Sequence, residues 1–75
     1  MFKLTILRPD KKIFEGEVNS LVVPGLGGGM EILSHHAPLV GVLKSGTIKY
    51  DDKTYELKDA ALLEVGGNSA KILIA

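Results

Sequence analysis

The fold is decided in residues 25–46, which read Gly25-Leu26-Gly27-Gly28-Gly29-Met30-Glu31-Ile32-Leu33-Ser34-His35-His36-Ala37-Pro38-Leu39-Val40-Gly41-Val42-Leu43-Lys44-Ser45-Gly46. This stretch holds six of the chain's nine glycines and both of its histidines, and it runs from a glycine cluster into a nearly continuous apolar segment. Ordering a glycine costs more conformational entropy than ordering any other residue, so a cluster of them needs a geometric or contact reason. We therefore predict a loop and a strand that meet something outside the chain.

Composition limits what the rest of the chain can be. Its 75 residues are expected to form one domain, residues 1–75. Without cysteine the chain has no disulfide, no thiol nucleophile and no Cys-based zinc site. Nine basic residues balance nine acidic ones, which argues against nucleic-acid binding. No signal-peptide pattern is visible and no apolar run reaches the roughly 20 residues of a membrane span, so we expect a cytoplasmic domain without direct membrane insertion.

The residue pattern predicts strands and little or no helix. Apolar and polar residues alternate with period 2 from Phe2 to Ile6, and turn residues separate further short runs of the same kind. A longer strand is expected over residues 13–23, with a bulge or bend at Gly16. We predict an all-β fold, an antiparallel β-sandwich or flattened barrel of about 8–10 short strands.

Some of the predicted strands are apolar on both faces. Residues 21–23 and 39–43 show this fully, and Leu62-Leu63 in part. In the second segment, Leu39, Gly41 and Leu43 share one face and Val40 and Val42 the other. Two explanations remain open: a closed barrel with scattered exposed apolar residues, or a sheet face covered by a partner protein.

The candidate chemical motifs are incomplete, so we predict no catalytic residue, no cofactor and no metal. The Gly25-x-Gly27 pattern lacks the third glycine and the helix of a dinucleotide-binding loop. Adjacent His35 and His36 point to opposite sides of an extended chain, and no further ligand stands at a suitable spacing. Ser34 has no visible orienting acid or oxyanion hole, and no convergent polar set indicates a small-molecule substrate.

The run from Gly28 to Gly46 resembles the hallmark of the epsilon subunit of F-type ATP synthases, above all in His36-Ala37-Pro38-Leu39. Leu62-Leu63-Glu64-Val65 and the Gly67-Asn68 turn are similar to later segments of that family. Glu31, Ser34-His35, Ser45 and residues 59–61 depart from its pattern. The family commonly carries a C-terminal helix pair that regulates hydrolysis and, in some members, binds ATP. The resemblance implies only its β domain, so neither property is assigned to this chain.

The resemblance implies a non-catalytic central-stalk subunit that connects gamma to the c-ring and couples proton flow to ATP synthesis. Such a subunit is peripheral, at the cytoplasmic face of the bacterial inner membrane. Carried over by position, the residues expected on the c-ring side are Gly28, Gly29, Met30 and Glu31. Those expected on the gamma side are His36, Leu39, Gly41, Leu43, Thr47 and Asp59.

An alternative of another class is a lipoyl- or biotinyl-type carrier domain. These carriers are also flattened β-barrels of this size, and Asp51-Asp52-Lys53-Thr54 resembles a hairpin tip with a modifiable lysine. The two halves of the chain show no repeat, and the glycine cluster has no use in a carrier. Those two features favour the stalk subunit.

Overall fold

The computed structural model describes residues 1–75 and contains nine strands and no helix. The strands are β1 (Phe2–Leu7), β2 (Lys12–Val18), β3 (Ser20–Gly25), β4 (Gly28–Leu33), β5 (Leu39–Leu43), β6 (Gly46–Tyr50), β7 (Lys53–Leu57), β8 (Ala61–Gly66) and β9 (Ser69–Ile74). The predicted all-β fold and the predicted number of strands are confirmed.

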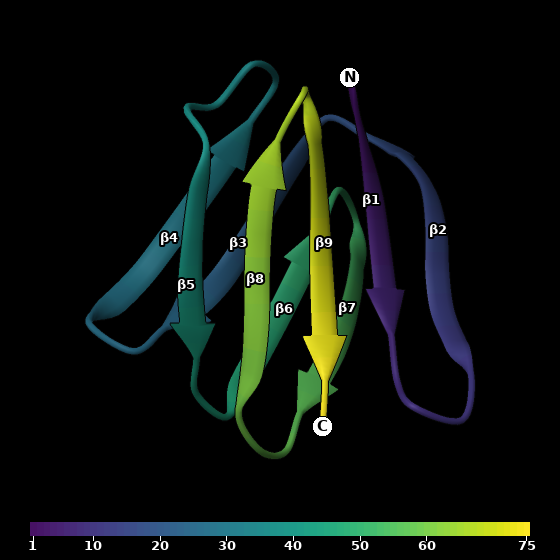
Figure 1. Ribbon diagram of the computed structural model, residues 1–75, viewed down its shortest axis with the longest axis vertical. Coiled ribbons are helices and arrows are strands. Elements are labelled where there is room, and N and C mark those ends of the chain that lie inside the picture. The colour runs from purple at the N-terminus through teal and green to yellow at the C-terminus, as the bar shows by residue number, and fades with distance from the viewer.

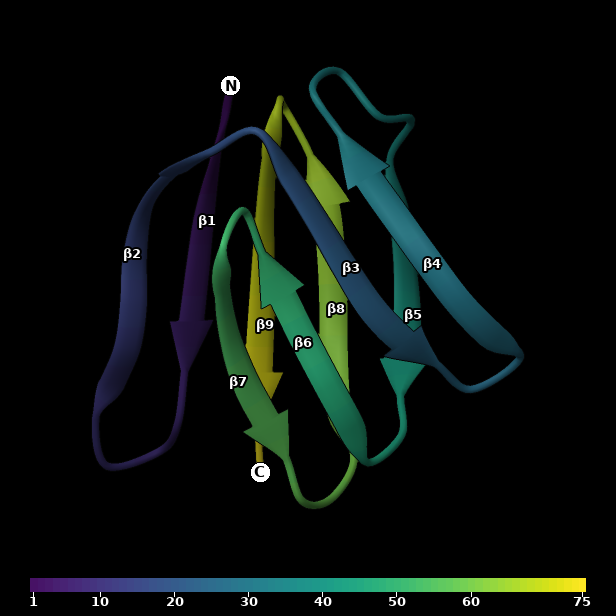
Figure 2. The same ribbon diagram turned by 180° about the vertical axis from the view of Figure 1, so that it is seen from behind.

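The strands form one hydrogen-bonded sheet that folds back on itself into two layers. Its order is β2-β1-β9-β8-β5-β3-β6-β7, with β4 paired to β3. Strands β2, β1, β9, β8 and β5 make what we call the front layer (Figure 1). Strands β4, β3, β6 and β7 make the back layer (Figure 2).

All neighbouring strands are antiparallel except β1 and β9, which run parallel. Antiparallel pairs can be joined by short turns, whereas a parallel pair needs a long connection. The rest of the chain supplies that connection between β1 and β9, which lie side by side in the middle of the front layer (Figure 1). The sandwich is therefore mixed rather than purely antiparallel.

Backbone hydrogen bonds between the two layers form at a single corner. Gly25 of β3 pairs with Leu43 of β5, flanked by hydrogen bonds from Leu26 N–H to the Val42 carbonyl (3.0 Å) and from Lys44 N–H to the Pro24 carbonyl (2.9 Å). A Cβ on Gly25 would lie 2.6 Å from the Gly28 carbonyl oxygen, a distance no side chain tolerates. Only glycine lets β3 turn into β4 and still reach β5.

Side chains close the opposite side, where no strand pairing joins β2 to β7. The Phe14 ring packs on Tyr50 with 4.7 Å between ring centroids, a distance typical of favourable aromatic pairs. A Cβ on Gly16 would lie 3.1 Å from the tip of the Phe14 ring, so the glycine makes room for that ring. The structure thus explains Gly16 by packing.

The predicted long strand over residues 13–23 is two strands, and the predicted bulge lies elsewhere. Gly16 pairs regularly with β1, whereas the register shifts near Ile13, which has no partner in the ladder. At Asn19 the chain leaves the front layer for the back layer. The Asp51 carboxylate holds this crossing by accepting hydrogen bonds from the backbone N–H groups of Asn19 (2.9 Å) and Ser20 (3.1 Å).

The space between the layers is filled by apolar side chains alone. No charged or polar residue is buried, and no buried side-chain nitrogen or oxygen lacks a partner. Strand alternation sends every second residue inward, as β1 shows with Phe2, Leu4 and Ile6 buried. The core consists of Phe2, Leu4, Ile6, Val18, Leu21, Val23, Ile32, Leu43, Ile48, Tyr50, Leu57, Ala61, Leu63, Val65, Ala70, Ile72 and Ile74.

Gly46 gives a test of the corner's geometry. It has φ +151°, and a Cβ there would lie 3.0 and 3.2 Å from two carbons of the Pro24 ring. We expect Gly46→Ala to lower the free energy of unfolding by about 1–3 kcal/mol, through backbone strain and the rigid ring, as measured by urea denaturation. At Gly66 a Cβ would meet no atom within 4 Å, so Gly66→Ala is the matched control. Equal stability of the two variants would contradict this account.

Candidate partner-binding surface

Four apolar side chains lie in register across the outer face of the front layer. The ladders pair Val42 with Leu62, Leu62 with Leu73, and Leu73 with Leu7. In each of these strands, more buried and less buried residues alternate. The four residues belong to the less buried set, so their side chains point outward. Val42 is 48% exposed and the other three are half-buried. We call this set the apolar row.

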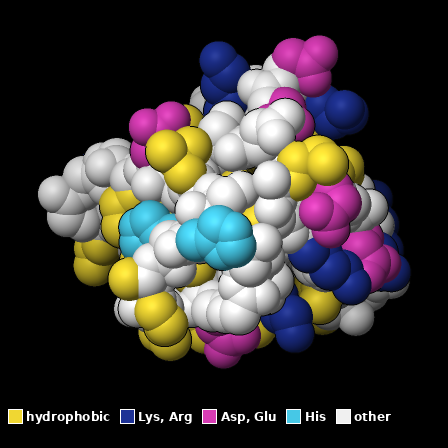
Figure 3. All heavy atoms as spheres, turned by 90° about the horizontal axis from the view of Figure 1, so that it is seen from above, with side chains coloured by type: hydrophobic (Ala, Val, Ile, Leu, Met, Phe, Trp, Pro, Cys, Tyr) yellow, Lys and Arg dark blue, Asp and Glu magenta, His cyan; other side chains and the backbone are white.

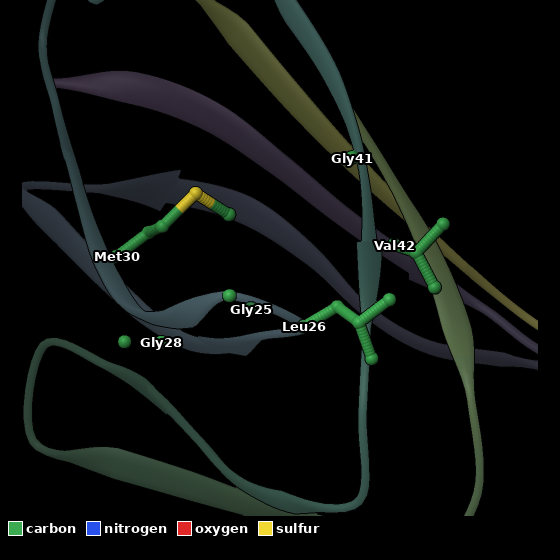
Figure 4. A pocket seen from close by; sticks show the side chains of 8 residues that line it. Gly25, Leu26, Gly28, Met30, Gly41 and Val42 are labelled. Atoms are coloured by element: carbon green, nitrogen blue, oxygen red, sulfur yellow. The ribbon is translucent and has the colours of Figure 1, made fainter.

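Two shallow hollows flank Val42 in the apolar row. One is lined entirely by apolar residues: Val42, Ala60, Ala61, Leu62, Leu73, Ile74 and Ala75. The other lies between β5 and the β3–β4 turn and is lined by residues 25–30, Gly41 and Val42 (Figure 4). Leu26, 67% exposed, and Val40, 70% exposed, extend the apolar surface beside these hollows. Such a contiguous apolar patch on a small domain is typical of a protein-binding surface.

The glycines of the β3–β4 turn leave bare backbone at the rim of the second hollow. Gly28 needs to be glycine because its φ is +133°. A Cβ on Gly27 would meet nothing within 4 Å, and one on Gly29 only the Val23 carbonyl at 3.9 Å. Neither of these two glycines is required by φ or by crowding inside the domain. Their missing side chains let another chain approach the backbone closely.

The residues predicted for the c-ring side lie together at the start of β4. Gly28, Gly29 and Glu31 are exposed, whereas Met30 is half-buried. The Met30 side chain lies between the glycine turn and β5, near Gly41, where its methyl carbon would be 3.8 Å from an added Cβ (Figure 4). The Met30 side chain therefore lies at the bottom of the hollow and not at its exposed rim.

The residues predicted for the gamma side are not brought together. His36 lies in the β4–β5 loop, and Leu39 and Gly41 lie on the half-buried inner side of β5. The remaining three are Leu43, Thr47 and Asp59. Thr47 faces outward from the back layer and donates a hydrogen bond to Glu56, and Asp59 lies in the β7–β8 loop.

Leu43 is fully buried in the core, so its side chain is not available to a partner. The outward neighbours Val40 and Val42 take its place at the surface of β5, because alternation turns them away from the core. Sequence reasoning had put Val40 and Val42 on the opposite face but did not select them as contact residues. It also missed Leu7 and Leu73, since only the strand pairings bring them into line with Val42.

Both histidines lie in the β4–β5 loop, whereas the glycine turn precedes β4, so the two are at opposite ends of that strand. Figure 3 shows the end of the sandwich that carries the histidines. The ring Nδ1 of His36 is 2.7 Å from the Ala37 carbonyl oxygen. No group of three or more His, Cys, Asp or Glu residues in the structure is arranged to hold a metal ion.

Charged side chains share the outer face of the front layer with the apolar row, and a cluster of them lies on β1 and β2. The Glu15 carboxylate accepts hydrogen bonds from Lys12 and from Lys3, whose Nζ is 2.9 Å from Glu15 Oε2. These two ammonium groups lower the pKa of Glu15 from 4.5 to about 2. The outer face of the front layer thus carries the apolar row with charged residues beside it, including Glu64 and Lys71, which lie opposite each other on β8 and β9.

The fold and this surface define a small β-sandwich domain whose outer face is suited to binding another protein. The chain belongs to the family of the ATP synthase delta/epsilon chain, beta-sandwich domain, which it matches over residues 1–75. The predicted resemblance to the epsilon subunit is confirmed.

Relatives and solved structures agree with this assignment. The chain is 39% identical over 77 residues to an ATP synthase epsilon chain of Chlorobaculum tepidum, covering 96% of this chain and 86% of the relative. It is 42% identical over 65 residues to one of Bdellovibrio bacteriovorus, covering 85% of this chain and 46% of that protein. The chain thus spans most of the first relative and about half of the second.

Two solved structures share the fold at lower identity. A chain of the Tetrahymena thermophila mitochondrial ATP synthase central stalk and c-ring superposes with a TM-score of 0.82 at 15% identity, covering 96% of this chain and 61% of that one. A chain of the Euglena gracilis mitochondrial ATP synthase gives a TM-score of 0.84 at 23% identity, covering 95% of this chain and 48% of that one.

No helix that could cross a membrane is present in the structure.

The Glu15 ion pairs give a pH-dependent signature. Because the folded pKa lies below the unfolded one, the contribution of Glu15 to stability is present above pH 4.5 and is lost as the pH falls toward 2. An NMR titration of the Glu15 carboxyl should have its midpoint near 2, and Glu15→Gln should flatten the fall in stability between these pH values. A midpoint at 4.5 would contradict the two ion pairs.

Proposed function

We propose that this chain is a non-catalytic central-stalk subunit of a proton-translocating F-type ATP synthase. In this role it connects gamma to the c-ring and couples proton flow to ATP synthesis. Residues 1–75 act in it as one domain, peripheral to the cytoplasmic face of a bacterial inner membrane. The observation that carries the proposal is the apolar row, an exposed and in-register apolar surface in a domain of the epsilon-chain family.

Gamma is the proposed partner of the apolar row. Removing apolar surface from water lowers the free energy by about 25 cal/mol per Å², and a stable interface buries roughly 800 Å² on each partner. Val42 is the most exposed residue of the row and lies between two hollows that can receive a partner's side chains. Gly41 lines one of these hollows and Val40 extends the proposed contact along the outer face of β5, whereas Leu39 faces inward and His36 lies in the loop before the strand.

The polar loops of the c-ring are the proposed partner of the glycine turn and the start of β4. Gly28 and Gly29 are exposed and have no side chains, so polar loops can approach their backbone closely, and Glu31 adds a charge. Met30 supports this segment from behind through its contact with the Gly25 corner.

The two proposed contacts meet at the corner that joins the layers. Leu26 in the glycine turn donates its N–H to the Val42 carbonyl, so one hydrogen bond separates the c-ring contact from the gamma contact. A force applied to the glycine turn is thus delivered directly to the strand that gamma covers. This short and rigid path suits a subunit that transmits rotation.

The carrier-domain alternative has no specific support in the structure. The tip beside Lys53 is pinned to the sandwich through Asp51, whose carboxylate binds the backbone of Asn19 and Ser20. We therefore advance no second function.

A charge in the apolar row tests the gamma contact. Val42→Glu places a carboxylate in the middle of the surface, and we expect the affinity for an ATP synthase complex stripped of its own epsilon chain to fall by about tenfold or more. Binding is measured by titration calorimetry. Thr54→Glu, at an exposed strand position of the back layer, is the matched control and should bind normally. Unchanged binding of Val42→Glu would refute this interface.

A side chain on the glycine turn tests the c-ring contact. A Cβ on Gly29 would meet only the Val23 carbonyl oxygen, at an ordinary contact distance of 3.9 Å, so Gly29→Gln should leave the unfolding midpoint and the gamma affinity unchanged. We expect it to reduce ATP-driven proton pumping in reconstituted vesicles, because the added side chain holds the two backbones apart. Full pumping would count against the assignment of this turn to the c-ring.

A further inference from the structure

Asn68 ties together three segments at the end of the sandwich that carries the histidines. It lies in the turn between β8 and β9. Its Oδ1 accepts a hydrogen bond from the His35 backbone N–H at 2.7 Å, and its Nδ2 donates one to the Met1 carbonyl at 3.1 Å. One side-chain amide therefore joins the β4–β5 loop, the β8–β9 turn and the start of β1.

Both residues of the shorter bond have unusual backbone angles. His35 has φ +62° and Asn68 has φ +55°, in the left-handed region that most side chains disfavour and that Asn and His enter more often than others. Residues persist in this region when their surroundings hold them there. At the adjacent Gly67, with φ +58°, the turn uses glycine instead.

The angle at His35 sets the direction of His36. The His36 N–H donates to the Leu33 carbonyl at 3.2 Å, which closes the loop on itself. Figure 3 shows the two imidazoles side by side near the middle of this end of the molecule. A loop already held in its binding conformation loses less entropy when a partner binds, so its apparent affinity is higher.

We propose that Asn68 is a positioning residue for partner binding: it holds the Ser34–Ala37 loop so that His35 and His36 are presented to the partner in one arrangement. This inference rests on the proposed function, because the partner is the gamma-containing stalk. Asn68 acts through the loop and does not itself need to touch the partner.

The test uses two substitutions at one position. Asn68→Gly removes both side-chain bonds while allowing φ +55° without strain. Asn68→Asp keeps an oxygen for the His35 N–H and loses only the donor to Met1. Amide hydrogen exchange of His35 is followed by NMR in the 75-residue chain, and affinity is measured against the ATP synthase complex stripped of its epsilon chain.

In Asn68→Gly we expect the His35 amide to exchange about tenfold faster. We also expect the affinity to fall about fivefold, because the loop has its binding conformation in a smaller fraction of the molecules. Asn68→Asp should keep both properties within about twofold of the wild type. Gly66→Ala, at the end of β8 in the same hairpin but with no neighbour for its Cβ, is the control for general disturbance of the hairpin.

The outcomes separate this inference from the proposed function. If the wild-type chain binds the complex but Asn68→Gly binds equally well, the positioning role is refuted and the stalk function stands. Unchanged His35 exchange in Asn68→Gly also refutes it. If the wild type itself does not bind, the proposed function fails and the positioning role fails with it.

Discussion

The architecture depends on the close approach of backbones at Gly25. Because this residue has no side chain, β3 can turn sharply into β4 and still pair with β5, where an added Cβ would lie 2.6 Å from a carbonyl oxygen. This contact makes two layers out of one curled sheet. It also sets the glycine turn beside Val42, so the two proposed partner contacts share a corner of the molecule.

A sandwich of this size has only one interior, and that interior is already filled by apolar side chains. Additional apolar residues on the same strands must face outward because successive side chains alternate. Their alignment across β5, β8, β9 and β1 turns separate exposed residues into a continuous surface. In an isolated domain such a surface is a liability, whereas in an assembly it is where a neighbouring subunit binds.

The two ends of the sandwich are organised differently. At the Gly25 end, the backbone itself joins the turn to the front layer. At the histidine end, the loop is longer, and a side-chain amide from another hairpin holds it in place. The Asp51 carboxylate plays a similar part where the chain crosses between layers at Asn19. The domain is therefore stiffened by a few polar contacts around a wholly apolar core.

The sequence by itself determined the family, the turns and most of the strands, with the face of each on which a residue lies, because these follow from local alternation and from the His36-Ala37-Pro38-Leu39 motif. It did not separate β2 from β3, which the pattern joins into one strand. It could not determine which strands become neighbours. The parallel pairing of β1 with β9, the crossing at Asn19 and the line from Val42 to Leu7 arise from contacts between distant segments. For the same reason, only the tertiary structure showed that Leu43 is buried and that Thr47 faces away from β5. A period of two specifies a face, but packing between layers decides which faces are hidden and which residues stand side by side.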